Sequence, residues 1–428
     1  MRISESREQF LKKIASKILW CVLYLMLFRL AVQNVSGVLR KFLLTKSEPS
    51  GHLLNFTESA AVHRYRAEEH TVVTDDGYVL TVFRIPKGKN CRGGVRQPPV
   101  LIMHGLLLSS DSWLDSGPHA GLGYLISDEC YDLWSGNVRG SHYSRKHLTL
   151  NPDTNPQYWQ FFLHEVGAYD LPAIIDYILH STKSQKLIYI GYSQSGMSLL
   201  IMCSERPKFC DKLRLAILLH PASRMTNTKS KAFRLITKIY QSIEPYLSST
   251  LDFEAFPKEG KLQTTTASLC QDFYVADIVC RSILNLIDSP HPGSIDVSTI
   301  RSLSGHFPSG TSAKTLAWFN QILNADSFQN FDYGSTRNLE VYGSRLPPPY
   351  NINATNVPVV IIHGENDNLV SSKDIRWLKD QLPNVLELFF VKDPLWNHFD
   401  VPYSRHTKKL LFPKISEYLR KYSRKSIF

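Results

Sequence analysis

Ser193 lies where the sequence changes from a short apolar run to a longer apolar stretch. The run spans residues 187–190, and the stretch after the serine begins at Gln194. A strand that turns sharply into a helix lifts a serine hydroxyl above the sheet at the helix N-terminus, where it can attack an acyl carbon. The usual pattern is Gly-x-Ser-x-Gly, but residues 191–195 read Gly-Tyr-Ser-Gln-Ser and Gly196 follows one place late. Ser193 is therefore the candidate nucleophile.

Two further side chains could activate this serine. A serine hydroxyl attacks when a histidine takes its proton, and a carboxylate must orient and stabilise that imidazole. Asp367 follows the apolar run 357–362, and His398 follows the run 386–391. If both runs are parallel strands, their loops emerge at the sheet edge where Ser193 lies. We predict a catalytic triad of Ser193, Asp367 and His398.

Other acids and histidines compete for these roles. Asp374 is better explained as a carboxylate in the first turn of a helix, whereas Glu365 and Asp400 are the remaining alternatives for the acid. A histidine at the end of a strand commonly bonds to the backbone. We expect that structural role for three others, which are His104, His220 and His363.

The negative charge that develops in the transition state needs backbone donors. One is usually the N–H of the residue after the nucleophile, and the other comes from the loop after an early strand. Gln194 occupies the first position. The second donor comes from Leu106. His104 and Gly105 turn the chain after an apolar run, so that the N–H of Leu106 points toward the serine. We predict that Leu106 and Gln194 form the oxyanion hole.

The elements that must position these residues follow from the apolar runs. Short runs of this kind that alternate with helical stretches, such as residues 166–180, are typical of a mostly parallel sheet with helices on both faces. An antiparallel hairpin with an Asp-Gly turn is expected over residues 70–86. The predicted architecture is therefore a doubly wound α/β fold. The six predicted strands are residues 99–104, 131–134, 187–190, 213–219, 357–362 and 386–391.

One interval between strands is unusually long. About 135 residues separate the run that ends near residue 219 from the run that begins at residue 357, which is far more than a crossover helix needs. We predict a helical cap over residues 223–349, inserted before the strand that carries the acid. The core would then consist of residues 60–222 and 350–422.

Residues 232–247 show the helical pattern of this cap most clearly. An apolar helix face could cover an acyl-binding cleft and leave it at a lipid–water interface, although a permanently packed helix is an equal alternative. The residues that share the face are Phe233, Ile236, Ile239, Tyr240 and Ile243.

Residues 1–37 resemble a targeting segment. Basic residues precede the apolar run 18–28, which Arg29 interrupts. The run is short for a membrane span, so a cleaved signal peptide is favoured over a retained membrane anchor. Entry into the secretory pathway would lead to a secreted or lysosomal protein. It would also expose three sequons to glycosylation, at Asn34, Asn55 and Asn353.

The net charge of +11 is concentrated at the two ends of the chain. Residues 1–46 hold nine Lys and Arg against two Glu, and residues 403–428 hold eight against one. The body between them is therefore slightly negative. Basic and aromatic residues do not alternate along it. These features argue against nucleic-acid binding.

The seven cysteines do not form a recognisable metal site. The chain contains no CxxC pair and no HExxH sequence, and neither a metal nor an organic cofactor is implied. Cys270 and Cys280 are the most favoured disulfide pair, while Cys203 and Cys210 are equally compatible with free buried thiols. Cys91 and Cys130 are left unassigned.

Taken together, these residues resemble the acid lipases, the α/β-hydrolase family that includes gastric lipase, lysosomal acid lipase and their insect relatives. The resemblance runs from about residue 60 to residue 420. The matching segments are residues 63–65, 76–80, 84–86, 104–107, 132–140, 143–147, 169–173, 308–312, 348–350 and 397–398.

The resemblance implies the α/β-hydrolase fold, the same triad and oxyanion donors, and a cap disulfide between Cys270 and Cys280. The implied activity is hydrolysis of triacylglycerols or sterol esters at a lipid–water interface. The family normally has Gly-His-Ser-Gln-Gly at the nucleophile, so Tyr192 and Ser195 are departures. We expect Ser195 to displace the next helix slightly and slow the reaction modestly.

A catalytically impaired lipid carrier is the alternative function. The triad alone would also suit a peptidase or thioesterase.

Overall fold

The computed structural model describes residues 54–423, apart from residues 90, 92–96, 248–253 and 258. The predicted targeting segment, Cys21 and the Asn34 sequon fall outside these residues. Within the described part of the chain, no helix combines the length and the apolar character needed to cross a membrane.

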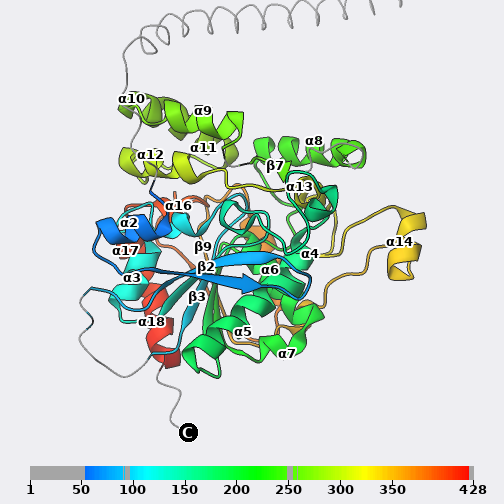
Figure 1. Cartoon of the computed structure of the whole chain (residues 1–428), viewed down its shortest axis with the longest axis horizontal. Helices are drawn as coiled ribbons and strands as arrows, with labels where there is room; N and C mark the ends of the chain where they lie inside the picture. The colour runs from blue at the N-terminus through cyan, green and yellow to red at the C-terminus, as the bar shows by residue number, and fades with distance from the viewer. Residues whose placement is uncertain (1–53, 90, 92–96, 248–253, 258, 424–428) are drawn as a thin grey trace, which may run out of the picture. The chain divides into compact units, whose positions relative to one another are not determined.

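An eight-stranded sheet forms the centre of the protein (Figure 1), in the order β1-β2-β4-β3-β5-β6-β9-β10. The first two neighbour pairs in this order are antiparallel and the other five are parallel. The mostly parallel, doubly wound fold is therefore confirmed. The strands are β1 (Glu68–Val73), β2 (Val79–Ile85), β3 (Val100–Met103), β4 (Leu133–Gly136), β5 (Leu187–Tyr192), β6 (Leu213–Leu219), β9 (Val359–His363) and β10 (Val385–Phe390).

Helices cover both faces of this sheet because its central strands are apolar on both sides. Along β5, Leu187 and Tyr189 belong to one buried cluster and Ile188 and Ile190 to the other, as the alternation of side chains in a strand requires. The first cluster contains α5 (Leu171–Thr182) and α6 (Gln194–Glu205). The second contains α3 (Leu122–Asp128) and α18 (Phe412–Ser423), with α2 (Phe56–Val62) beside them.

The hairpin turn between β1 and β2 behaves as its sequence predicts. Gly77 has φ +93° and its N–H donates to the carbonyl of Thr74, which is a conformation that glycine adopts without strain. The strand limits differ from the predicted runs by up to two residues. For example, β4 begins at Leu133 and β9 at Val359.

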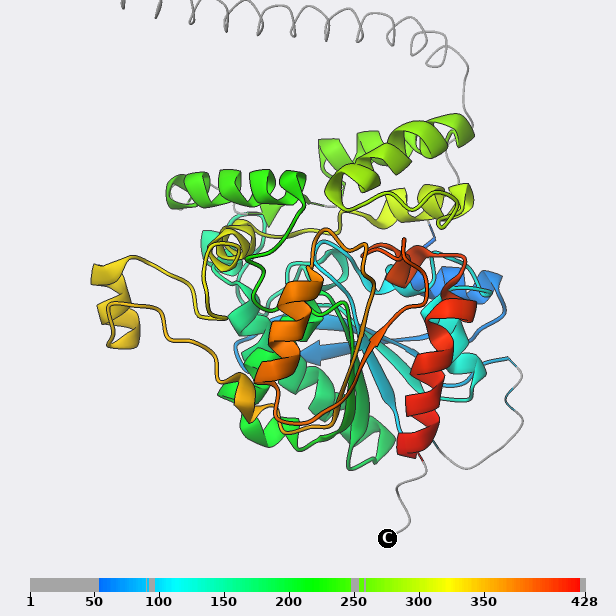
Figure 2. The same cartoon turned by 180° about the vertical axis from the view of Figure 1, so that it is seen from behind.

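The segment between β6 and β9 forms a layer of helices beyond the carboxyl edge of the sheet (Figures 1 and 2). One short helix, α14, projects away from the rest of this layer. A two-stranded sheet pairs β7 (Glu254–Ala255) with β8 (Thr311–Ser312). The helices are α8 (Lys231–Leu247), α9 (Lys261–Leu269), α10 (Phe273–Val275), the π-helix η5 (Ala276–Cys280), α11 (Arg281–Ile287), α12 (Val297–His306), α13 (Ala313–Ile322) and α14 (Ser335–Tyr342).

The apolar face of α8 is only partly buried. Phe233 is buried and stacks edge-on against Phe319 of α13, with ring centroids 5.6 Å apart. Ile239 and Ile243 are exposed, at 48% and 38%. The apolar face predicted from the sequence is therefore wider than the part of α8 that packs against the rest of the protein.

Three disulfides occur among the described cysteines. Cys270–Cys280 joins the end of α9 to η5. Cys203–Cys210 closes the corner after α6, where free thiols were an equal alternative. Cys91–Cys130, which the sequence left unassigned, joins the loop after β2 to the residues after α3.

Candidate active site

Ser193 sits on a sharp turn between β5 and α6. Its backbone has φ 55° and ψ −116°, a strained conformation for a residue with a side chain. Hydrogen bonds hold the turn in place, because Ser193 N–H donates to the Leu219 carbonyl and its own carbonyl accepts from Ala222 N–H. Strain that neighbouring hydrogen bonds maintain is typical of functional positions.

His398 lies between the serine and a buried carboxylate. Its Nε2 is 2.9 Å from Ser193 Oγ, and its Nδ1 is 2.7 Å from Asp367 Oδ2. Asp367 occupies the loop after β9, and His398 the loop after β10. The parallel strands thus bring together three residues that are far apart in the sequence.

Four N–H groups surround the carboxylate of Asp367. Its Oδ1 accepts from the backbone N–H groups of Leu369 and Val370, and its Oδ2 accepts from His398 and His220. Burial by itself would raise the pKa of Asp367. The charge of His398 and the hydrogen bonds from both histidines outweigh burial and hold that pKa well below its usual range. Asp367 is therefore ionised.

His220 was expected to have only a structural role, and the structure corrects that expectation. Its Nδ1 is 2.7 Å from Asp367 Oδ2, and the side chain is fully buried. Burial lowers the pKa of His220 below its usual value, although the hydrogen bond to Asp367 and the charge of that residue raise it. The available signal was its position, because His220 directly follows β6, the strand next to β9.

The rival acids have other partners. Asp374 accepts from Asn227 N–H at 3.0 Å, in the first turn of α15 (Ser372–Gln381). Asp400 bonds to His291 Nδ1 at 2.6 Å. Glu365 is exposed. Of the four acids, only Asp367 contacts the imidazole of His398 in the described structure.

His104 has the backbone-bonding role that its sequence position suggests. Its Nδ1 lies 2.8 Å from the Gly105 carbonyl, and its Nε2 accepts from Val138 N–H. Burial lowers the pKa of His104 to about 4, so it is neutral at physiological pH.

His220, His363 and Asp367 form a cluster whose spacing alone could hold a metal ion. Their ligand-capable atoms all lie within 4.8 Å of one another, and all three are buried. However, both oxygens of Asp367 already accept hydrogen bonds. We interpret the cluster as support for Asp367 rather than as a metal centre.

The two predicted oxyanion donors flank the serine. Gln194 is the first residue of α6, and the first N–H groups of a helix have no partner inside it. Leu106 lies in the loop after β3 and lines the same cavity as Ser193 and His398. A side chain at Gly105 would approach the ring of Tyr192 to 2.9 Å, so this loop depends on glycine to lie close to the nucleophile.

The departures from the usual nucleophile pattern make contacts of their own. Tyr192 Oη donates to the His398 carbonyl at 2.9 Å. Ser195 is fully buried, and its hydroxyl donates to the His104 carbonyl at 2.5 Å. The glycine that the helix needs is Gly196, because a Cβ there would lie 2.6 Å from Pro221 Cβ.

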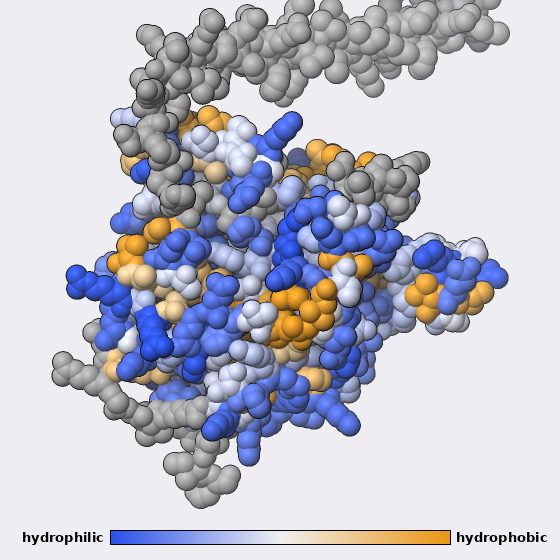
Figure 3. Space-filling view, viewed as in Figure 1, coloured by the Kyte–Doolittle hydropathy of each residue, from blue (hydrophilic) through white to orange (hydrophobic). Residues whose placement is uncertain are grey.

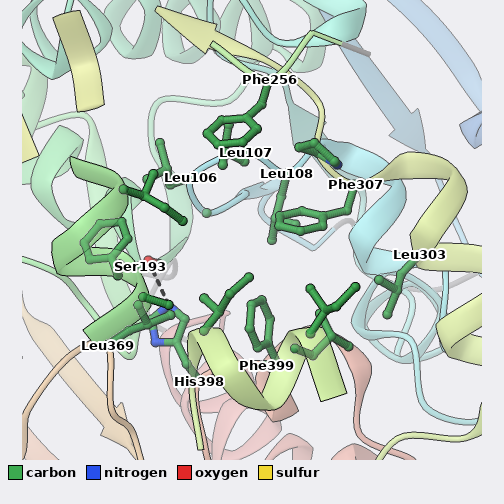
Figure 4. A pocket seen from close by; sticks show the side chains of 18 of the residues that line it. Leu106, Leu107, Leu108, Ser193, Phe256, Leu303, Phe307, Leu369, His398 and Phe399 are labelled. Atoms are coloured by element: carbon green, nitrogen blue, oxygen red, sulfur yellow. Dashed lines mark hydrogen bonds between the residues drawn. The ribbon is translucent and has the colours of Figure 1, made fainter. Parts of the chain in front are cut away.

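A cavity of about 340 Å³ opens from Ser193 and His398 (Figure 4). Its wall is almost entirely apolar and comes from both the core and the helical layer. Figure 4 shows leucine and phenylalanine side chains that line this cavity, among them Leu106, Leu107, Phe256, Leu303, Phe307, Leu369 and Phe399.

Comparison with known proteins gave consistent matches. A family model described as a partial alpha/beta-hydrolase lipase region matches residues 56–117, and one for the alpha/beta hydrolase fold matches residues 98–241. Lipase 3 of Drosophila melanogaster is 33% identical, over 84% of this chain and 91% of that protein. Lipase 1 of the same species is 34% identical, over 86% and 80%. Gastric triacylglycerol lipase of Bos taurus is 33% identical, over 81% and 86%.

Proposed function

This chain belongs to the acid lipase family of α/β-hydrolases, and from that premise we propose that it cleaves acyl esters of neutral lipids through Ser193, Asp367 and His398. The family makes it a carboxylic ester hydrolase of the lipase type. The observation that carries the residue assignment is the continuous hydrogen-bonded chain from Ser193 Oγ through His398 to Asp367.

The proposed reaction has two halves. His398 Nε2 takes the proton of Ser193 as its oxygen attacks the ester carbonyl, and ionised Asp367 stabilises the imidazolium that forms. The N–H groups of Gln194 and Leu106 bind the oxyanion. His398 then gives the proton to the departing alcohol, which leaves an acyl-enzyme. Water activated by the same histidine releases the fatty acid.

The cavity supports an apolar acyl chain as the recognised part of the substrate. Its walls are leucine, isoleucine and phenylalanine side chains, and their apolar surface is favourably covered by hydrocarbon. A peptide would bring polar backbone groups that such walls leave unpaired. Triacylglycerols and sterol esters are therefore the proposed substrates.

The surface of the helical layer supports action at a lipid–water interface. Apolar side chains on α10, η5 and α11 point outward, and Figure 3 shows apolar areas on this part of the protein. We take residues 223–349 as a cap between the core parts 60–222 and 350–422. The most exposed of these side chains are Phe273, Tyr274, Ile278 and Leu286.

The proposed location is the secretory pathway, with secretion or delivery to lysosomes. Three disulfides favour an oxidising compartment. The sequons at Asn55 and Asn353 have exposed asparagines, which suits glycosylation.

The proposal is tested by assaying the purified full chain on matched short- and long-chain esters, dissolved and emulsified, between pH 4 and 8. A fluorophosphonate probe should label the protein at Ser193 and block hydrolysis. Binding of lipid without hydrolysis of any ester would instead favour a carrier, and preference for a peptide or thioester would change the substrate class.

A further inference from the structure

Residues 288–294 belong to the connection from α11 to α12 and contact the two loops that carry Asp367 and His398. We call this segment the strap. It contacts both loops through hydrogen bonds, of which those to the backbone N–H of His398 and to the side chain of Asn397 are buried. Asn397 Nδ2 donates to the Ser289 carbonyl at 2.6 Å, and Asn366 Nδ2 donates to the Pro290 carbonyl at 3.2 Å. The segment between the cap helices thus touches the residues next to the acid and the base of the triad.

Asp288, the first residue of the strap, makes the most direct contacts. Its Oδ2 accepts from His398 N–H at 2.7 Å, and its Oδ1 accepts from Asn368 N–H at 2.8 Å. The residue is only 4% exposed. One carboxylate therefore binds the backbone of the histidine itself and the backbone next to Asp367.

We propose that Asp288 is a positioning residue, which sets the separation of the Asp367 and His398 loops and places its negative charge beside the catalytic imidazole. This inference rests on the proposed function, because Asp288 can affect catalysis through Asp367 and His398 only if those two residues act on Ser193.

The geometric part follows from the two hydrogen bonds. A carboxylate has a fixed distance between its oxygens, so two N–H groups bonded to it cannot drift apart without losing a bond. Bonds from N–H to a charged, buried acceptor are stronger than neutral ones. The loops after β9 and β10 also contact each other directly, because Asn366 N–H donates to the Trp396 carbonyl and His398 Nδ1 bonds to Asp367. Asp288 adds a bridge from the cap that bonds to the backbone of both loops.

The electrostatic part involves the ionisable groups around this carboxylate, which include Tyr192. Asp367 from the loop after β9 and His398 from the loop after β10 act on it directly. His220 and His363 lie behind them, where His220 contacts Asp367, His363 and His398. Asp400 lies nearby but bonds to His291 and Ser294 of the strap. Burial and then repulsion from Asp367 raise the pKa of Asp288, whereas the charge of His398 and the two backbone N–H groups lower it. Asp288 therefore carries its negative charge most readily while His398 is protonated.

Burial and these negative charges have opposite effects on the pKa of His398. Burial lowers its pKa, whereas Asp367 and Asp288 raise it, and the net pKa is above the usual value. A negative charge stabilises the imidazolium, so removing Asp288 lowers the pKa of His398. The neutral histidine, which is the form that accepts the serine proton, then persists to lower pH.

The experiment compares wild type with Asp288→Asn, Asp288→Glu and a control, Asp277→Asn. Asp277 is an exposed cap carboxylate that pairs with Arg281, so its replacement makes the same charge change away from the site. kcat and KM for a dissolved ester are measured between pH 4 and 8, with rates expressed per active site titrated by a fluorophosphonate. Thermal unfolding is followed in parallel.

Asp288→Asn should lower kcat about tenfold or more and leave KM within about twofold, because the substrate does not touch this residue. The acid-side pKa of kcat/KM should also move to lower pH. Asp288→Glu should keep the acid-side pKa while kcat falls, since it retains the charge but not the geometry. Asp277→Asn should match wild type.

Unchanged kcat and pH profile in Asp288→Asn would overturn the proposal. A lower unfolding temperature with normal kcat per titrated site would also overturn it, because Asp288 would then be only structural. If Asp288→Asn does not fold, the kcat of Asp288→Glu decides. A wild type that hydrolyses no ester would instead remove the proposed function, and this inference with it.

Discussion

The hydroxyl of Ser195 donates a 2.5 Å hydrogen bond to the backbone carbonyl of His104. His104 is the residue before Gly105 and Leu106, the loop that presents the second oxyanion donor. The serine that replaces the usual glycine therefore links the nucleophile helix α6 to that loop. The close approach of the helix to Pro221 is made by Gly196 and not by Ser195, so we expect the hydrogen bond of Ser195 to matter more than crowding by its Cβ.

This contact reverses the effect expected for replacing Ser195. Ser195→Gly leaves the buried His104 carbonyl without its donor and should lower kcat several-fold, less than the 10²–10³ typical of losing an oxyanion donor altogether. Ser195→Ala should do the same. If crowding by Cβ mattered instead, glycine would raise kcat and alanine would not. Ser198→Ala, a buried hydroxyl in the same helix, is the control.

Tyr192 gives a second prediction about the altered nucleophile pattern. Its hydroxyl bonds to the carbonyl of His398 in a fully buried position. Tyr192→Phe removes that bond and nothing else, so the free energy of unfolding should fall by about 1 kcal/mol and kcat should fall a few-fold as the histidine loop loosens. Equal kcat values for the variant and wild type would mean that Tyr192 only fills space.

Ser193→Ala should reduce ester hydrolysis by several orders of magnitude and leave the unfolding temperature nearly unchanged. The oxygen is the attacking atom, while the side chain contributes little to core packing. Rates on a dissolved ester and a thermal melt measure the two effects. Turnover within tenfold of wild type would exclude Ser193 as the nucleophile.

The choice of acid is tested by comparing two buried aspartates. Asp367→Asn should slow kcat by a factor on the order of 10³–10⁴, because the imidazolium loses its counter-charge and correct tautomer. Asp374→Asn should instead lower stability with little change in kcat, since its carboxylate bonds to Asn227 and Arg224 and not to His398. The opposite pattern would make Asp374 the functional acid.

The sequence predicted those parts of the site that follow from strand order. β6 was predicted to the residue, and parallel strands place their following loops at one sheet edge. From that rule we predicted that Ser193, Asp367 and His398 lie close together, and they do so in the structure. Apolar runs mark strands locally, so no long-range information was needed.

The contributions of His220 and Asp288 could not be predicted in the same way. His220 meets Asp367, 147 residues later, and Asp288 meets the backbone of His398, 110 residues later. The first contact depends on which strands are neighbours, and the second on the path of the cap. Neither leaves a periodic or spaced pattern in the sequence.

The outer face of the cap is expected to bind the lipid surface. Phe273 and Ile278 are 56% and 66% exposed, and apolar side chains of this kind gain free energy on entering a lipid surface, up to about 1.5–3 kcal/mol for complete transfer. Replacing both with serine should weaken adsorption to an emulsion by about tenfold or more. Activity on an emulsified ester should fall accordingly.

Activity on a dissolved ester should remain at the wild-type level, because neither side chain lines the cavity beside Ser193. Leu148→Ser provides the matched control, since Leu148 is 66% exposed but lies on the core, in the loop after β4. The measurement is the ratio of emulsified to dissolved activity for each variant. An equal ratio in all three proteins would mean that another surface binds the lipid, and a loss on both substrates would indicate damage to the cap rather than to adsorption.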